Sequence, residues 1–241
     1  LVDIEEGILE NVVKLVKKII EAKQADIELE WSTDRCDCLP GADYVITTIG
    51  VGGRRAWEQD VFIPRKYGIN QPVGDTAMPG GISRAMRMIP AMLDIVKDTQ
   101  RLAPNARLYN YSNPMTAICR AIRKELEYPI TGLCIGTAES EWYIADFMGW
   151  DRKRVTTLAA GINHCTFIYD YRLDGQDAWP MVRDKIEMEK AGEALLHTSQ
   201  PFAWEFFLKY GAFPAPGDRH ITEFFTEYFP GGLYYGKILG H

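Results

Sequence analysis

Three short segments of this 241-residue sequence carry side chains that could do chemistry together. They are Asn113-Pro114, Cys134 and Asn163-His164, and each lies at or just after the end of a predicted β-strand. A thiolate and an imidazole can jointly bind a borderline or soft divalent cation, with water or substrate oxygens in the other positions. We therefore expect the three segments to converge on one face. The alternative is that Cys134 is a small buried apolar residue and His164 a hydrogen-bonded core histidine.

A second group of residues suits a nucleotide. Asp3 lies between a predicted strand and a predicted helix, where a dinucleotide-binding fold places the acid that contacts ribose hydroxyls. The alternative is that Asp3 caps the helix, a role that aspartate often takes. Gly50 and Gly52 follow a predicted strand and allow a ligand to approach the main chain, although a lone glycine cluster is a weak signal.

The cysteines bear on a second possible metal site and on the cellular compartment. Cys36 and Cys38 lie two positions apart near a Pro-Gly turn and imitate a metal-binding pair, but they lack partner ligands, so we interpret them as packing or surface residues. The chain has 5 cysteines, an odd number without the spacing of a disulfide framework. This pattern indicates a reducing compartment, and we expect a cytoplasmic protein.

The elements that must position these residues alternate in the first 150 residues. Apolar residues between Glu5 and Lys23 recur at the spacing of an amphipathic helix. Further helices are predicted over 82–102, interrupted or kinked near Pro90, and over 116–127. Strands are predicted over 1–4, 26–30, 43–49, 107–111 and 130–134. Such β-α-β repeats indicate an α/β fold with a Rossmann-like, doubly wound parallel sheet, which binds ligands at the carboxyl ends of its strands.

The pattern changes near residue 150. Strands are predicted over 155–160 and 165–173, followed by an Asp174-Gly175 turn that could close a hairpin, and helices over 179–196 and 202–210. An aromatic-rich stretch over 204–229 could line a sugar site or a subunit interface. We therefore divide the chain into a nucleotide-binding domain, 1–150, and an α+β substrate domain, 151–241.

The ends of the sequence indicate missing elements. The chain opens on Leu1-Val2-Asp3-Ile4, without a start methionine or a signal-peptide pattern, and it stops in mid-element. We expect an internal segment of a longer protein that lacks the first strand and glycine loop of the sheet, and an incomplete second domain.

Composition excludes several classes of protein. The sequence has 27 basic and 33 acidic side chains and a net charge of −6, which argues against a general nucleic-acid binder. Hydrophobic residues make up 46% and charged residues 25%, which is ordinary for a globular domain. No apolar run reaches the roughly 20 residues of a membrane-spanning helix, so we expect no membrane partner.

The sequence resembles the NAD-dependent glycoside hydrolases of family 4 over nearly its whole length. The motifs that carry the resemblance occur in family order: Val51-Gly52-Gly53-Arg54, Ile63-Pro64-Arg65-Lys66-Tyr67-Gly68-Ile69, Gly74-Asp75-Thr76, Pro79-Gly80-Gly81, Tyr111-Ser112-Asn113-Pro114-Met115, Gly132-Leu133-Cys134, Ala160-Gly161-Ile162-Asn163-His164 and Gly217-Asp218-Arg219-His220. The similarity is closest to the α-galactosidase and α-galacturonidase branch. It also implies a lactate/malate dehydrogenase-like sheet.

The resemblance implies an unusual hydrolysis of an α-linked galactoside, glucoside or uronide. In the family, bound NAD⁺ takes hydride from C3 of the sugar, and a divalent metal, usually Mn²⁺, binds the 2- and 3-oxygens. A base removes the C2 proton, the glycosidic oxygen leaves by elimination, water adds, and the hydride returns. A C3 ketone beside a Lewis acid stabilises the enolate that develops.

Motif positions imply the site residues of this chain. The implied metal ligands are Cys134 and His164; the implied substrate-binding residues are Asn113, Asn163 and His220; the implied cofactor-binding residues are Asp3, Gly50, Gly52 and Asn113; and the candidate catalytic residues are Tyr210, Asp218 and Asp75. Tyr210 and Asp218 are candidates for the base or a proton relay, and Asp75 is a candidate replacement for the general acid. The alternative for Asp75 is a loop or cap residue.

One position departs from the family pattern. The residue after the metal cysteine is commonly His, Asn or Asp, whereas this chain has Ile135. Isoleucine can neither donate a proton nor hydrogen-bond a phosphate or carboxylate. This change indicates a different general acid and a divergent substrate.

Three hypotheses follow. The first is an NAD- and metal-dependent glycosidase, expected by resemblance to form a homodimer or homotetramer. The second is a lactate/malate-type dehydrogenase, which would need no Cys–His metal site and would produce NADH. The third, motivated by Ile135, is a family member that binds sugar or NAD⁺ without turnover.

Overall fold

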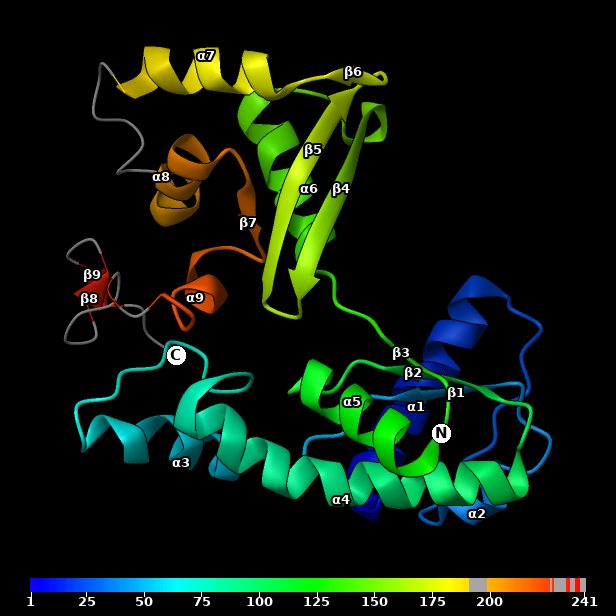
Figure 1. Ribbon diagram of the computed structural model, residues 1–241. Coiled ribbons are helices and arrows are strands. Elements are labelled where there is room, and N and C mark those ends of the chain that lie inside the picture. Colours follow the sequence, from blue (N-terminus) through cyan, green and yellow to red (C-terminus); the bar gives the residue numbers. More distant parts are fainter. Residues whose placement is uncertain (191–198, 226, 228–232, 235–236, 239–241) are drawn as a thin grey trace.

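The fold consists of a parallel sheet in the first half of the chain and an antiparallel sheet in the second (Figure 1). The structure is a computed structural model that describes residues 1–190, 199–225, 227, 233–234 and 237–238. Its elements are α1 (Glu6–Lys23), α2 (Arg35–Cys38), β1 (Tyr44–Thr47), α3 (Gly53–Arg65), α4 (Met78–Leu102), β2 (Arg107–Asn110), α5 (Met115–Leu126), β3 (Ile130–Gly132), α6 (Gly136–Met148), the 3₁₀ turn η1 (Arg152–Arg154), β4 (Val155–Ile162), β5 (Cys165–Leu173), β6 (Gln176–Asp177), α7 (Trp179–Lys190), α8 (Pro201–Tyr210), β7 (Phe213–Ala215), α9 (Asp218–Ile221), β8 (Leu233–Tyr234) and β9 (Lys237–Ile238).

The parallel sheet has the strand order β1-β2-β3, and its core lies against α4 and α5. Leu108 of β2 pairs with Ile130 of β3, and both side chains are buried against Met88, Met92 and Ile118. Helix α4 continues through Pro90, so the predicted interruption there does not occur. The Rossmann-like α/β class is confirmed in this half of the chain.

The predicted strands over 1–4 and 26–30 are wrong. In their place the structure has one isolated parallel bridge between Val2 and Ser32. A strand needs continuous neighbours for its amide and carbonyl groups, and a single bridge supplies too few. The predicted helix is confirmed as α1, but its apolar face is half exposed: Leu9 and Val13 are buried, while Ile8 and Ile19 are 55% and 51% exposed.

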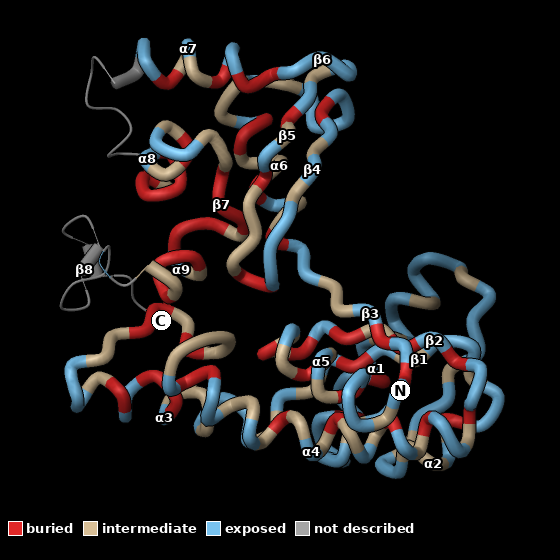
Figure 2. Tube along the Cα trace, in the orientation of Figure 1, coloured by how far each residue is buried: buried red, intermediate tan, exposed pale blue. Residues whose placement is uncertain are grey.

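The second half is built on the β4–β5 hairpin, with β6 and β7 pairing β5 in antiparallel fashion. Asp174 and Gly175 connect β5 to β6, as their turn chemistry predicts. Helices α6, α7 and α8 contribute to a core that includes Tyr171, Trp204 and Phe213. Figure 2 shows this core as buried segments of β5, β7 and α8.

The aromatic-rich stretch is therefore mainly core in its described part. Trp204 and Phe207 are fully buried, and Phe206 packs beside Phe202 and Phe225. Tyr228 and Phe229 lie outside the described residues.

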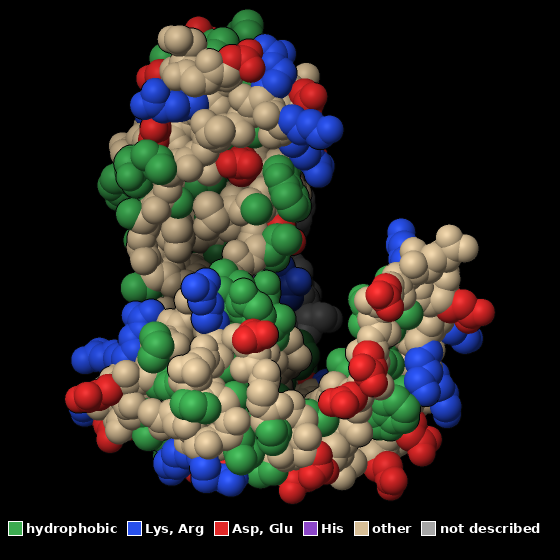
Figure 3. All heavy atoms as spheres, turned by 90° about the vertical axis from the view of Figure 1, so that its right-hand side faces the viewer, with side chains coloured by type: hydrophobic (Ala, Val, Ile, Leu, Met, Phe, Trp, Pro, Cys, Tyr) green, Lys and Arg blue, Asp and Glu red, His purple; other side chains and the backbone are tan. Residues whose placement is uncertain are grey.

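The two halves meet where β3 leads into α6. A β-carbon on Gly136, the first residue of α6, would lie 2.1 Å from the β-carbon of Pro216, which follows β7. In the side view of Figure 3, a hollow in the surface separates the antiparallel half from the part of the molecule at the right of the picture.

Within the described part of the chain, every helix is too short or too polar to cross a lipid bilayer.

Candidate functional site

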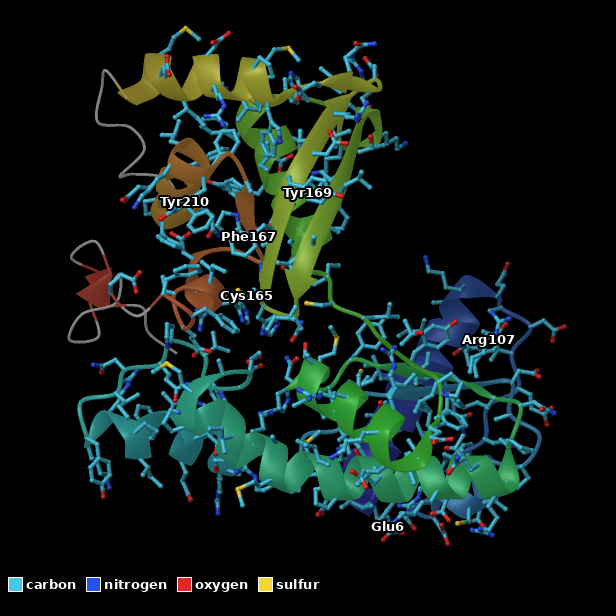
Figure 4. All side chains as sticks on the ribbon, viewed as in Figure 1. Glu6, Arg107, Cys165, Phe167, Tyr169 and Tyr210 are labelled. Atoms are coloured by element: carbon cyan, nitrogen blue, oxygen red, sulfur yellow. The ribbon has the colours of Figure 1, made fainter. Side chains whose placement is uncertain are left out.

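The tip of the β4–β5 hairpin carries two of the predicted site residues. Ile162 pairs with Cys165, so Asn163 and His164 form the two-residue turn between the strands. His164 has a φ of +64°, a left-handed conformation that costs energy in a residue with a β-carbon. Both side chains are buried, which is unusual for a hairpin turn. Figure 4 shows this end of the hairpin, marked by Cys165, pointing toward the parallel half.

Cys134 approaches the hairpin tip from the parallel sheet. It follows β3 and lines one pocket together with Asn163, His164 and Met115. Hydrogen bonding to His164 lowers the pKa of the Cys134 thiol, against the effect of partial burial. The thiolate, which is the metal-binding form of cysteine, is therefore favoured at this position.

The loop before α4 reaches the other side of the His164 ring. Thr76 Oγ1 donates to Asp75 Oδ1 at 2.7 Å, so its oxygen accepts from Nδ1 of His164, also at 2.7 Å. Asp75 Oδ1 lies 3.6 Å from the same nitrogen. A histidine that donates from Nδ1 presents Nε2 to a metal, as metal-binding histidines commonly do.

Charge reinforces this arrangement. Burial alone would lower the pKa of His164, but Asp75 and Cys134 raise it to about 9. Burial alone would raise the pKa of Asp75, but its contacts with His164 and Thr76 lower it to about 2. The cluster thus pairs an imidazole that favours its cationic form with the Asp75 carboxylate and with a thiol whose pKa is lowered, and a divalent cation would replace the imidazolium proton.

Asn113 joins the same cluster. Its Nδ2 donates to Asp75 Oδ2 at 2.9 Å, and its carbonyl accepts from Arg84 Nε at 3.1 Å. The expected convergence is confirmed: the structure brings together the segments that carry Asn113, Cys134 and His164.

His220 completes the polar surroundings. Its ring centroid lies 3.9 Å from that of His164, and donor atoms of Asp75, His164 and His220 all lie within 4.8 Å of one another. Burial, and then the charge on His164, lowers the pKa of His220 to about 4, which keeps it neutral.

Two buried atoms at this site have no hydrogen-bond partner among the described residues, His220 Nδ1 and Asn163 Oδ1. Buried polar atoms are rarely left in this state, because each costs about 1–3 kcal/mol. Unsatisfied nitrogen and oxygen atoms beside a cysteine sulfur and an imidazole fit a borderline divalent cation, with water or substrate oxygens in its other positions.

The predicted cofactor residues lie at the carboxyl edge of the parallel sheet and at the N-terminus. Gly52 has a φ of +82°, and a β-carbon there would lie 2.6 Å from that of Ala56, so only glycine fits this tight turn. The Arg84 guanidinium lies 3.8 Å from the position of a β-carbon on Gly50, which suits an anionic cofactor near bare main chain. Asp3 Oδ1 accepts from the Glu5 amide at 2.9 Å in the turn before α1, while the N-cap Glu5 has no side-chain capping bond, so Asp3 does not cap the helix.

Two predicted catalytic residues make contacts outside this cluster. Tyr210 is 58% exposed at the end of α8, where it contacts Phe206 and Lys209, and among the described residues it has no contact with the cluster (Figure 4). Asp218 accepts from the amides of Phe202 and Ala203 in the first turn of α8, at 2.9 Å each. Burial raises the pKa of Asp218 to about 7 despite these two hydrogen bonds.

The remaining candidates also have defined places. Ile135 is 56% exposed beside Cys134 at the start of α6. Cys36 accepts from Arg101, far along the chain from the cluster, in keeping with a packing or surface role.

Sequence reasoning missed Thr76 and Glu223. Glu223 is buried, and its Oε1 accepts from the amides of Val73 and Gly74 at 2.8 and 2.5 Å. Thr76 belongs to the Gly74-Asp75-Thr76 motif, so this motif could have identified it as a site residue. Glu223 has no local signal, because its partners lie about 150 residues away in the chain.

Comparisons with known proteins identify the family of this chain. The family described as "Family 4 glycosyl hydrolase" matches residues 1–148, and its C-terminal domain matches residues 159–236. An α-galactosidase of Rhizobium meliloti is 32% identical over 95% of this chain and 46% of its own length. An α-galacturonidase of Thermoanaerobacterium saccharolyticum is 32% identical over 84% of this chain and 49% of its own. The chain spans about half the length of the curated relatives it matches.

Solved structures give the same result. A 6-phospho-β-glucosidase from Thermotoga maritima, solved with manganese, NAD⁺ and glucose-6-phosphate, superimposes with a TM-score of 0.76 at 26% identity, over 94% of this chain and 51% of that one. A malate dehydrogenase from Picrophilus torridus has a TM-score of 0.59 at 15% identity, over 92% of this chain and 65% of that one, and shares the fold alone.

Proposed function

The chain belongs to glycosyl hydrolase family 4, and from this premise we propose that it is the NAD- and metal-binding part of a glycosidase that cleaves an α-linked galactoside, glucoside or uronide. The observation that carries the proposal is the approach of Cys134 to His164, on which Asp75 and Thr76 also converge. A dehydrogenase would not need this thiolate–imidazole pair.

The chain's own residues supply binding and orientation. Cys134 and His164 would hold a divalent cation, for which we propose Mn²⁺, while Asn113, Asn163 and His220 hydrogen-bond sugar hydroxyls. Asp3, Gly50, Gly52 and Asn113 would hold NAD. When bound, NAD supplies a hydride acceptor and the cation a Lewis acid that acidifies protons beside a carbonyl.

Three residues are candidates for proton transfer: Asp75, Asp218 and Tyr210. Asp75 stays ionised because its pKa is about 2, which suits a group that orients His164. Asp218, with a pKa of about 7, can exchange a proton near neutral pH, and the exposed Tyr210 hydroxyl is accessible to a substrate. We assign the base to this pair as a proposal. Kinetic pH profiles of Asp218→Asn and Tyr210→Phe would distinguish them, because only the variant that lacks the base loses the acidic limb, the rise in activity as the base loses its proton.

The decisive experiment assays the full chain with NAD⁺, Mn²⁺ and a thiol reductant against α- and β-linked glycosides in D₂O. We expect cleavage of α-linked substrates, loss of cleavage on chelation, no net NADH and deuterium at C2 of the product. A cleaved product that keeps its original hydrogen at C2 would contradict the elimination route, because that route removes this hydrogen. Accumulating NADH would favour a dehydrogenase, and binding without turnover would favour a non-catalytic family member.

Three further proposals accompany this function. The protein acts in the cytoplasm, as its free cysteines suggest. It forms a homodimer or homotetramer, which sedimentation of the full chain would test. Finally, residues 1–150 and 151–241 act as separate cofactor and substrate domains, which limited proteolysis would test.

A further inference from the structure

One buried carboxylate lies outside every role assigned so far. Glu223 follows α9 in the second half of the chain and is 3% exposed. Its Oε1 accepts from two consecutive amides, those of Val73 and Gly74, which belong to the first half. An acceptor shared by two amides 149 and 150 residues away is a specific tertiary contact rather than a local cap.

The segment that Glu223 holds is constrained on its other side as well. Trp57 Nε1 donates to the carbonyl of Val73 at 2.7 Å. Gly74 has a φ of +67°, and a β-carbon there would lie 2.7 Å from Val61 Cγ2. The segment is therefore held between α3 and Glu223, with little room to move.

The two residues that follow this segment make the contacts that orient the predicted metal ligand. Asp75 and Thr76 both contact Nδ1 of His164, and Asp75 also accepts from Asn113. Displacing the Gly74 peptide would displace these side chains, because they belong to the next two residues along the chain.

Glu223 is also linked to the cluster through the turn that follows α9. Its amide donates to the carbonyl of His220 at 3.2 Å, and the ring of His220 lies against that of His164, with centroids 3.9 Å apart and the planes tilted by 50°. The Glu223 segment thus contacts the cluster by one route through the His220 ring and by another through the 73–76 loop.

We infer that Glu223 is a positioning residue for the metal site: it fixes the 73–76 loop against the second half so that Asp75 and Thr76 hold His164 Nδ1 and direct Nε2 toward the cation. This inference rests on the proposed function, because it presupposes that Cys134 and His164 bind a metal. Groups that orient a metal-binding histidine typically change metal affinity by about 10–100-fold when they are removed.

The test measures Mn²⁺ binding to the full chain by titration calorimetry, without NAD or sugar. We expect Glu223→Ala to bind Mn²⁺ about 10-fold more weakly than the wild type. Glu223→Gln should stay within about 3-fold, because its amide oxygen can still accept from both main-chain amides. Glu223→Asp keeps the charge but retracts the oxygens by one methylene, and it should fall between the two.

Glu141→Ala is the matched control. Glu141 also accepts a hydrogen bond, from Thr157 Oγ1 at 2.7 Å, but it holds no part of the 73–76 loop. Its removal should leave Mn²⁺ affinity unchanged. As a second readout, Co²⁺ substitution should give a thiolate-to-metal absorption band whose position changes in Glu223→Ala and not in Glu141→Ala.

The outcomes separate the two proposals. Wild-type affinity in Glu223→Ala and Glu223→Asp would overturn the inference while leaving the metal site intact. A Gln variant as weak as the Ala variant would also overturn it, because charge rather than amide contact would then control binding. If Glu223→Ala does not fold, the Asp and Gln variants decide by the same criteria. A wild-type chain that binds no Mn²⁺ would defeat the proposed function and this inference together.

Discussion

The two halves of this chain bury their apolar residues differently. The antiparallel half packs large aromatic side chains such as Trp204, Tyr171 and Phe213 until they are fully buried. The parallel half has a smaller aliphatic core around Met88 and Met92, and its first helix leaves much of its apolar face exposed.

This contrast shows how the site is assembled. The antiparallel half presents His164 on a hairpin tip and supplies His220 and Glu223. The parallel half contributes Cys134, Asn113 and the 73–76 loop from the edge of its sheet. Residues of both halves line the proposed site, so its geometry depends on how the halves are held together.

The substitution with the largest expected effect on stability is Trp204→Ala, in the antiparallel half. The Trp204 ring packs 4.7 Å from that of Phe147 and 4.8 Å from that of Phe213, and its Nε1 donates to the Tyr143 hydroxyl. Loss of a buried tryptophan costs about 3–5 kcal/mol, which we expect as a decrease in the free energy of unfolding measured by urea denaturation. A loss below about 1 kcal/mol would show that the aromatic core is not the main stabilising feature of this half.

A second test uses pH, because the antiparallel half buries an acid. The pKa of Asp218 is about 7 in the folded protein, against 3.8 for an aspartate in an unfolded chain, so between these values the folded state binds more protons than the unfolded state. The contribution of Asp218 to the free energy of unfolding is therefore highest below about pH 4 and declines as the pH rises toward 7. Relative to Asp218→Asn, the wild-type melting temperature should fall by several degrees from pH 4 to pH 7 and then level off. A difference that does not vary with pH would contradict the raised pKa.

The smallest expected effect lies in the parallel half. Ile19 of α1 is 51% exposed, so Ile19→Gln should change the free energy of unfolding by less than about 0.5 kcal/mol. Val13→Gln on the same helix is the contrasting variant, because Val13 is buried and its replacement should cost more. A loss above about 1 kcal/mol for Ile19→Gln would show that another surface covers this face in solution.

Sequence reasoning reached the features that are local or periodic. Alternating helix and strand patterns predicted the fold class and most elements, and strand ends predicted the convergence of Cys134, Asn113 and His164. It failed for the strand over 1–4, because an apolar run does not reveal whether a neighbouring strand is present to pair with it.

The contacts of Asp218 and Glu223 were out of reach for a different reason. The amides that bind Asp218 lie 15 and 16 residues away, and those that bind Glu223 lie 149 and 150 residues away. Neither a motif nor a spacing encodes such partners, because they depend on how α9 packs against α8 for Asp218 and on how the two halves dock for Glu223. The same limit applies to Tyr210, whose position at the end of α8 relative to the cluster is not encoded by a local pattern.

The left-handed conformation of His164 has an evolutionary consequence. A glycine at this hairpin position would relieve backbone strain and would be expected to make the fold more stable, yet it would remove the imidazole on which the site depends. Selection for stability alone would therefore favour losing this histidine. Within a lineage, its persistence or its replacement by glycine would distinguish chains still under selection for chemistry from those retained for binding alone.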